Sequence, residues 1–90
     1  MDDSTVVERF KALGDPVRWT IVRELRSGQR CACDLAERAN VTPPLLSHHL
    51  KVLREAGLIT GTRRGRWIDY DLVHDAIDEL FAGFDREAVM

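Results

Sequence analysis

Residues 31–58, CACDLAERANVTPPLLSHHLKVLREAGL, constrain the fold of this 90-residue chain more than any other segment. Apolar residues recur at helical spacing on both sides of a short turn at 38–42. Within that turn, Asn40 suits a left-handed helix end, while Thr42 and Pro43 suit the start of a new helix. The segment therefore predicts two consecutive helices. The inward-packing positions of the second are Leu46, Leu50 and Leu53.

The rest of the chain predicts three further helices and one hairpin. Thr5 and Glu8 have the spacing of a capping box, and Asp15-Pro16 is a helix-start pair. An isolated hairpin is only marginally stable unless it packs against helices. We therefore expect the hairpin to pack beside the fourth helix as a wing. The predicted fold is mainly α in a single domain, 1–90: helices at about 5–13, 16–27, 32–39, 43–56 and 73–86, and a two-stranded wing at about 58–72.

Length and composition limit the class of protein. Ninety residues bury only a modest core, and an apolar fraction of 44% leaves material for dimerisation. No run is long enough to span a bilayer, and the acidic start Met1-Asp2-Asp3 does not fit a signal peptide. We therefore expect a cytoplasmic protein whose thiols stay reduced, with no membrane partner.

The net charge of −2 conceals a basic centre. Residues 41–67 carry five basic residues against Glu55 alone, whereas residues 68–90 carry seven acidic residues against Arg86. A local basic segment beside an acidic tail favours a nucleic-acid face on one side of the molecule. Chance segregation of charge is the alternative.

The second helix of the pair carries groups suited to DNA. In a helix-turn-helix this helix enters the major groove, where hydroxyl and imidazole groups reach base edges and an apolar side chain reaches a thymine methyl group. His49 lies at the edge of the inner face, and bonding to a neighbouring helix is an equal alternative for it. The predicted DNA-contacting residues of this helix and its cap are Thr42, Pro43, Leu45, Ser47, His48, His49 and Lys51.

The tip of the predicted wing is basic. Gly65 permits a tight turn, and Arg63, Arg64 and Arg66 can reach phosphates or the minor groove. Arginines that only solubilise a loop are the alternative. Their position directly after a helix-turn-helix pattern favours DNA contact.

The run LLSHHLKVLREAGLITGTRRGRWIDYDL, with DPVRWTIVREL upstream, resembles the ArsR/SmtB winged-helix repressors. The resemblance covers the chain from about Val7 to Leu80. It implies a winged helix-turn-helix homodimer that is joined through its first and last helices. It also implies binding to an imperfect palindrome in the protein's own operator-promoter DNA, weakened by an inducer. Leu45 departs from the smaller or polar residue of many members, so base preference is not carried over.

Cys31 and Cys33 are the candidate inducer site. One intervening residue makes them poor disulfide partners, and thiolates suit soft ions. CACDL resembles the CxCDL motif of arsenic-responsive members, which implies As(III) or Sb(III) as inducer ahead of Cd(II), Pb(II) or Zn(II). Ala36 stands where certain arsenic sensors have a third cysteine. Asp71 and His74 lack the second histidine of a zinc site of the SmtB type.

The spacing of the cysteines suggests how an ion could act. In a regular helix, residues i and i+2 point about 200° apart, so both sulfurs could bind one ion only if the first turn distorted. That distortion would reach the helix that braces the DNA reader. Two ordinary small residues, or a redox sensor, are the alternatives.

Other classes of function fit the chain less well. His48 and His49 lack a nucleophile-and-base arrangement, and no phosphate-cradling glycine loop is present, so we do not expect an enzyme. A family member that does not respond to metals and a protein-interaction domain are the remaining alternatives. Salt-dependent binding to the chain's own promoter DNA would exclude a pure protein-interaction domain.

Overall fold

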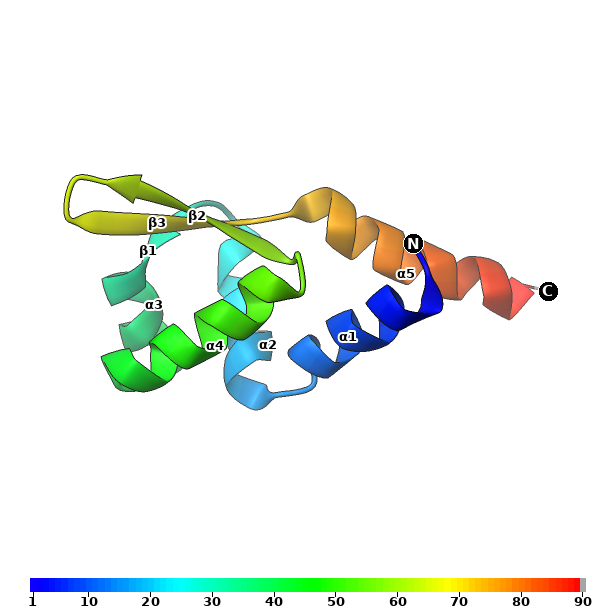
Figure 1. The fold of residues 1–90 in the computed structure, drawn as a ribbon, viewed down its shortest axis with the longest axis horizontal. Helices are drawn as coiled ribbons and strands as arrows, with labels where there is room; N and C mark the ends of the chain where they lie inside the picture. The colour runs from blue at the N-terminus through cyan, green and yellow to red at the C-terminus, as the bar shows by residue number, and fades with distance from the viewer. Residues whose placement is uncertain (90) are drawn as a thin grey trace.

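The structure is a computed structural model that describes the backbone of residues 1–89 and the side chains of residues 1–83. None of the helices in this part of the chain combines the length and apolar character that a bilayer crossing requires. Figure 1 shows the elements. In chain order they are α1 (Asp3–Leu13), α2 (Pro16–Leu25), β1 (Arg30–Cys31), α3 (Ala32–Ala39), α4 (Pro43–Glu55), β2 (Ile59–Arg64), β3 (Trp67–Leu72) and α5 (His74–Val89).

An aspartate caps each of the first two helices. Asp2 Oδ1 accepts the backbone N–H of Thr5 at 2.8 Å, so α1 begins two residues before its predicted start. The predicted capping box on Thr5 is wrong because a carboxylate three residues upstream already takes that N–H. Asp15 accepts the two N–H groups that follow Pro16, at 2.8 and 3.1 Å, which confirms the predicted start of α2.

Residues with left-handed backbone conformation follow the ends of α3 and α4. Asn40 has φ 55° and ψ 51°, as predicted, and turns the chain from α3 into α4. Gly57 has φ 76° and follows the last turn of α4. The second helix ends at Leu25, before the predicted 27, because its last turn tightens: the N–H groups of Arg26 and Gly28 donate to the carbonyls three residues before them.

The wing belongs to a three-stranded antiparallel sheet in the order β1-β3-β2. The prediction of two strands missed β1, which pairs Arg30 with Tyr70 and Cys31 with Asp69. Two residues carry no alternating pattern, so sequence periodicity could not reveal this strand. Its effect is to attach the start of α3 to the wing.

The core lies where α2, α3 and α4 meet the sheet, and the inward prediction for Leu46, Leu50 and Leu53 is confirmed. At the end of the molecule away from the wing tip, α1 and α5 lie side by side (Figure 1). There the rings of Phe10 and Phe81 meet edge to face, with centroids 6.1 Å apart. The largest fully buried side chains are Ile21, Leu25, Leu35, Leu53, Leu58, Ile59 and Leu80.

Candidate nucleic-acid interface and thiol site

Helices α3 and α4 form a helix-turn-helix. The turn is closed by the N–H of Val41, which donates to the carbonyl of Ala36 at 3.1 Å. Leu35 from α3 and Leu46 from α4 are both buried in the shared core. The inner faces of the two helices are thereby fixed, and the outer face of α4 is left to solvent.

The exposed face of α4 contains nearly all of the helix residues predicted to contact DNA. Thr42 occupies the N-cap position, but its side chain makes no capping hydrogen bond, so its hydroxyl is available to another acceptor or donor. Pro43 and Pro44 have no backbone N–H, so the start of α4 offers fewer N–H groups to an anion than an ordinary helix N-terminus does. The exposed residues of the predicted set are Thr42, Pro43, Leu45, Ser47, His48 and Lys51.

His49 is the exception, because it is buried with 7% of its surface exposed. Its Nδ1 lies 3.1 Å from Arg18 Nη1 and 3.8 Å from Asp15 Oδ2. Burial lowers the pKa of His49, and Asp15 opposes this. Of its two predicted roles, the structure realises bonding to a neighbouring helix. The prediction of His49 as a DNA contact is therefore wrong, because α2 covers it.

The opposite end of α4 is held by α1. Arg9 Nε donates to the carbonyl of Ala56 at 2.9 Å, and this carbonyl is one of those that the helix end leaves unpaired. A cation at a helix C-terminus is also favoured by the helix dipole. α4 is thus fixed at its C-terminal end by Arg9 and along its side by His49.

The wing presents its arginines at a tight turn. The pairing of Arg64 with Trp67 leaves a two-residue turn, in which Gly65 has φ 62°. Arg63, Arg64 and Arg66 are exposed, together with Trp67. The exposed faces of α4 and of the wing together provide hydroxyl, imidazole, ammonium and guanidinium groups, which suit phosphates and base edges.

Asp69 anchors one of these arginines and was not singled out by the sequence. Its carboxylate accepts Arg64 Nε at 2.7 Å and Nη2 at 3.3 Å. The hydrogen bond from Arg64 lowers the pKa of Asp69, and the same bond raises the pKa of Arg64. The available signal was an acidic residue in the strand that follows a basic turn, five positions after Arg64.

The two cysteines differ in backbone conformation. Cys31 lies in β1 and forms the N-cap of α3 with φ −78° and ψ 161°, while Cys33 lies within the first turn and is exposed. The premise that both lie in one regular helix is therefore wrong. An extended Cys31 frees its side chain from the 200° divergence that helical spacing imposes. The two thiols interact, and their interaction shifts the pKa values of both.

The interaction between the thiols shifts the pKa values of the two cysteines in opposite directions. It is the largest influence lowering the pKa of Cys31, and Asp34's backbone N–H lowers it further. The same interaction raises the pKa of Cys33, together with burial. The guanidinium of Arg30, next to Cys31 in the chain, is engaged by Asp34 at 2.9 Å. Cys31 is thus the first of the two to become a thiolate.

The donor set fits a soft ion in part. Two adjacent thiols can supply two sulfur ligands, as a thiophilic ion such as As(III) prefers. No group of three His, Cys, Asp or Glu side chains in the described residues is placed to hold a metal. Ala36 is partly buried against the core, and Asp71 accepts a hydrogen bond from Gln29 at 2.9 Å. A third ligand would have to come from outside this set.

An ion-pair network fixes the helix that follows the thiols. Asp34 pairs with Arg30 at 2.9 Å and with Arg38 at 3.0 Å, and Arg38 reaches Glu24 of α2 at 3.1 Å. The hydrogen bond from Arg30 is the first cause of the lowered pKa of Asp34. The network joins α3 to α2 directly beside Cys33.

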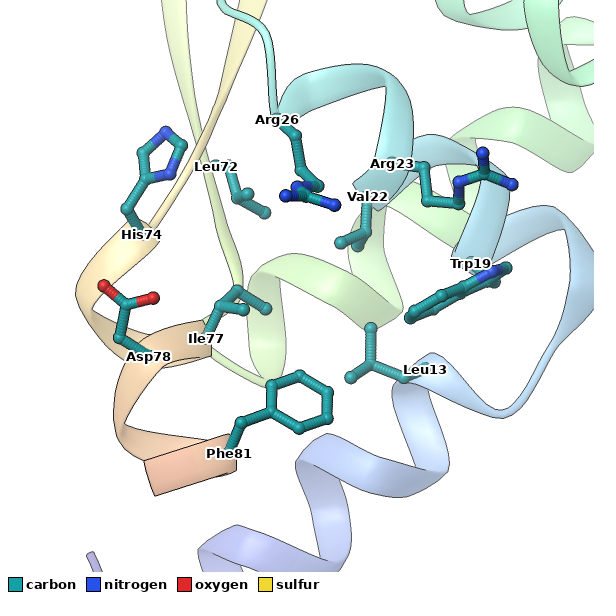
Figure 2. A pocket seen from close by; sticks show the side chains of 10 residues that line it. All are labelled: Leu13, Trp19, Val22, Arg23, Arg26, Leu72, His74, Ile77, Asp78 and Phe81. Atoms are coloured by element: carbon teal, nitrogen blue, oxygen red, sulfur yellow. The ribbon is translucent and has the colours of Figure 1, made fainter. Parts of the chain in front are cut away.

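A separate cleft of about 500 Å³, lined by neither cysteine, lies between the end of α1, α2, the end of β3 and α5. Figure 2 shows Trp19 and Phe81 on its walls, with the guanidinium of Arg26 reaching over Val22. Phe10 packs on Phe81 from α1 at its edge. The cleft therefore belongs to the same apolar end of the molecule as the paired helices α1 and α5.

Curated relatives include two named repressors. The chain is 43% identical over 78 residues to the HTH-type transcriptional repressor SmtB of Mycobacterium tuberculosis, covering 81% of this chain and 58% of that protein. It is also 43% identical over 76 residues to the arsenical resistance operon repressor of Bacillus subtilis, covering 83% and 72%. The chain thus spans just over half the length of the first relative.

A solved structure matches the fold closely. It is the homodimeric winged helix-turn-helix DNA-binding domain of a possible ArsR-family transcriptional regulator from Mycobacterium bovis. The TM-score is 0.78 at 24% identity, covering 98% of this chain and 87% of that one. Residues 15–60 match the family described as bacterial regulatory protein, arsR family, whose members are regulators and not enzymes. This chain belongs to the arsR family of bacterial regulatory proteins.

Proposed function

We propose that this protein is a transcriptional repressor that binds operator DNA as a homodimer and is released by a thiophilic ion. The observation that carries the proposal is the exposed face of α4 beside the basic wing tip. Ser47, His48 and Leu45 are available to base edges, with Thr42 and Pro43 at the helix start. Lys51 and the wing arginines are available to phosphates. A repressor that binds operator DNA is expected to act in the cytoplasm.

Homodimerisation through α1 and α5 is supported by the apolar surface at that end of the molecule. Val7, Phe10 and Phe81 are 49%, 39% and 43% exposed there, although all three are large apolar residues. A chain of 90 residues has a small core, so burying this apolar surface in a dimer would stabilise it. Two copies related by a two-fold axis match an operator that is an imperfect palindrome.

Cys31 and Cys33 are the proposed site for As(III) or Sb(III). Adjacent thiols with one lowered pKa suit a soft, thiophilic ion, and the similar repressor of Bacillus subtilis is named for arsenical resistance. Cys31 ends β1 and is the N-cap of α3, so an ion that draws its sulfur toward Cys33 acts on the helix that braces α4. Release follows if the ion favours a dimer with misplaced α4 helices.

The test is an operator titration with the DNA upstream of the protein's own coding region. Arsenite is expected to weaken binding of the wild type and to leave the double variant Cys31→Ser/Cys33→Ser bound. Parallel titrations with Sb(III), Cd(II), Pb(II) and Zn(II) identify the inducer. Release of the serine variant by arsenite would contradict the site, and release only by an oxidant would favour a redox sensor. Absence of salt-dependent binding to this DNA would contradict the repressor function itself.

A further inference from the structure

Asp69 occupies an unusual position on the outer face of the sheet. In the described part of the chain it is the one carboxylate that is buried, with 7% of its surface exposed. Buried carboxylates are retained only where they are paired. Asp69 has a hydrogen-bonded partner on the wing and a register neighbour at the thiol site, and these two residues lie on different strands.

The partner on the wing is Arg64. Asp69 accepts its Nε and Nη2, while Nη1 takes no part in this pair. The Arg64 side chain is 68% exposed, so a flexible guanidinium on the protein surface is held in one orientation. A bidentate pair of this kind fixes the plane of the guanidinium and leaves donors free for a phosphate.

The neighbour at the thiol site is Cys31. It stands opposite Asp69 in the antiparallel pairing of β1 with β3. Side chains directly opposite one another in such a pair project from the same face, with Cβ atoms about 4.5–5.5 Å apart. β1 has only two residues, so few backbone hydrogen bonds resist its displacement.

We propose that Asp69 is a positioning residue that couples the thiol site to the DNA-reading wing through Arg64. This inference rests on the proposed function and adds a second route to it, independent of α3. When Cys31 and Cys33 take one ion, Cys31 shifts against Asp69. The carboxylate then holds Arg64 in a different place, and the wing loses a preset phosphate contact.

The variant that isolates this role is Asp69→Asn. Asparagine has nearly the same shape but cannot accept both donors of Arg64 as a carboxylate does. The control is Asp71→Asn, which removes the same charge from the same strand; Asp71 contacts Gln29 and not Arg64. The quantity to measure is the ratio of operator Kd with arsenite to operator Kd without it. A ratio cancels the general gain in DNA affinity from losing a negative charge.

The expected result is a ratio at least about threefold smaller for Asp69→Asn than for the wild type, and an unchanged ratio for Asp71→Asn. Equal ratios for all three proteins would overturn the coupling and leave the proposed function standing. A wild type that does not respond to arsenite would overturn the proposed function, and the coupling with it.

A second variant guards against a folding defect in Asp69→Asn. Arg64→Lys breaks the bidentate pair from its exposed side and keeps the positive charge, so the fold is expected to survive. It should reduce the arsenite ratio in the same way. An unchanged ratio in Arg64→Lys would likewise overturn the coupling.

Trp67 supplies a readout without DNA. It pairs with Arg64 across the hairpin and is 51% exposed. In a Trp19→Phe background, arsenite is expected to change the fluorescence of Trp67, and Asp69→Asn is expected to remove that change while arsenite still binds the thiols. A change of equal size in Asp69→Asn would show that the wing moves without Asp69 and would overturn the proposal.

Discussion

Nδ1 of His49 lies 3.1 Å from Nη1 of Arg18, and this contact joins α4 to α2 inside the protein. A guanidinium only donates, so Nδ1 must accept and the ring proton lies on Nε2. The imidazole is therefore neutral in the folded protein. Burial lowers the pKa of His49 from its ordinary value of 6.5, with Arg18 and His48 adding to the effect and Asp15 opposing it.

A lowered histidine pKa predicts a loss of stability in mild acid. Below about pH 6.5 the unfolded chain binds a proton at His49 that the folded protein does not, so acid favours unfolding. The contribution is fully present above that pH and is lost as pH falls toward the folded pKa. We expect the urea midpoint to fall between about pH 7.5 and about pH 5.

The matched variant is His49→Asn, which places an oxygen acceptor near the position of Nδ1 and does not titrate. Its urea midpoint should depend less on pH than that of the wild type. An Asp15→Asn variant should lower the pKa of His49 further, because it removes the neighbouring charge that raises it. Parallel pH profiles for wild type and His49→Asn would contradict this account.

Replacing Gly57, at the end of α4, is expected to destabilise the protein through its backbone conformation. It has φ 76°, and a Cβ there would lie 2.9 Å from Nη2 of Arg9, which caps the helix through Ala56. Gly57→Ala should lower the free energy of unfolding by about 1–2 kcal/mol through the left-handed conformation. Gly83→Ala is the control: it lies inside α5 with open space around it, and should raise stability by about 0.5–1 kcal/mol. Chemical denaturation of both variants tests the contrast.

The wing predicts a change in salt dependence. If Arg63 and Arg66 each contact one phosphate, glutamine at either position should reduce the slope of log K against log salt by about 1. The loss should be similar on operator and unrelated DNA, because phosphates carry no sequence. Arg26→Gln, in the cleft beside α5, removes the same charge away from the interface and should leave the slope unchanged. A slope altered equally by all three variants would indicate only a net-charge effect.

Much of the helical framework could be predicted because its signals are local. Asp15-Pro16 at the start of α2 and Asn40 at the end of α3 act through residues two or three positions away. The helical spacing of Leu46, Leu50 and Leu53 likewise identifies the buried face of α4. These features need no knowledge of the tertiary fold.

The missed features depend on contacts that are distant in sequence. β1 exists because Cys31 meets Asp69, 38 positions along the chain, and this pairing removes Cys31 from the helix. His49 is buried because Arg18, 31 positions away, bonds to it. A helical wheel places His49 at the edge of the apolar face and cannot decide which helix will cover it. The backbone geometry of Cys31 therefore could not be predicted from helical spacing, and Cys31 and Cys33 remain a predicted ion site.

A substitution of Phe81 is expected to weaken dimerisation and operator binding together. It is 43% exposed and packs edge to face on Phe10, at the apolar end formed by α1 and α5. Phe81→Ser should weaken the proposed dimer, since burying a large aromatic side chain contributes about 1.5–3 kcal/mol. Sedimentation should show more monomer, and operator affinity should fall with it. Leu45→Ser, on the exposed face of α4, is the control that should alter operator binding and leave the dimer intact.

A cysteine in place of Ala36 is expected to increase the arsenite affinity of the thiol site. It lies one helical turn after Cys33, on the same face of α3, and is only partly buried. Ala36→Cys adds a single heavy atom there and supplies a third tethered sulfur, so arsenite should bind at least about tenfold more tightly. The arsenite concentration that releases operator DNA should fall in parallel. Ala39→Cys is the control, because it lies about 9 Å further along the helix axis from Cys33 and on another face. If both variants bind arsenite equally well, the third sulfur is not joining Cys31 and Cys33, and the proposed ligand geometry is wrong.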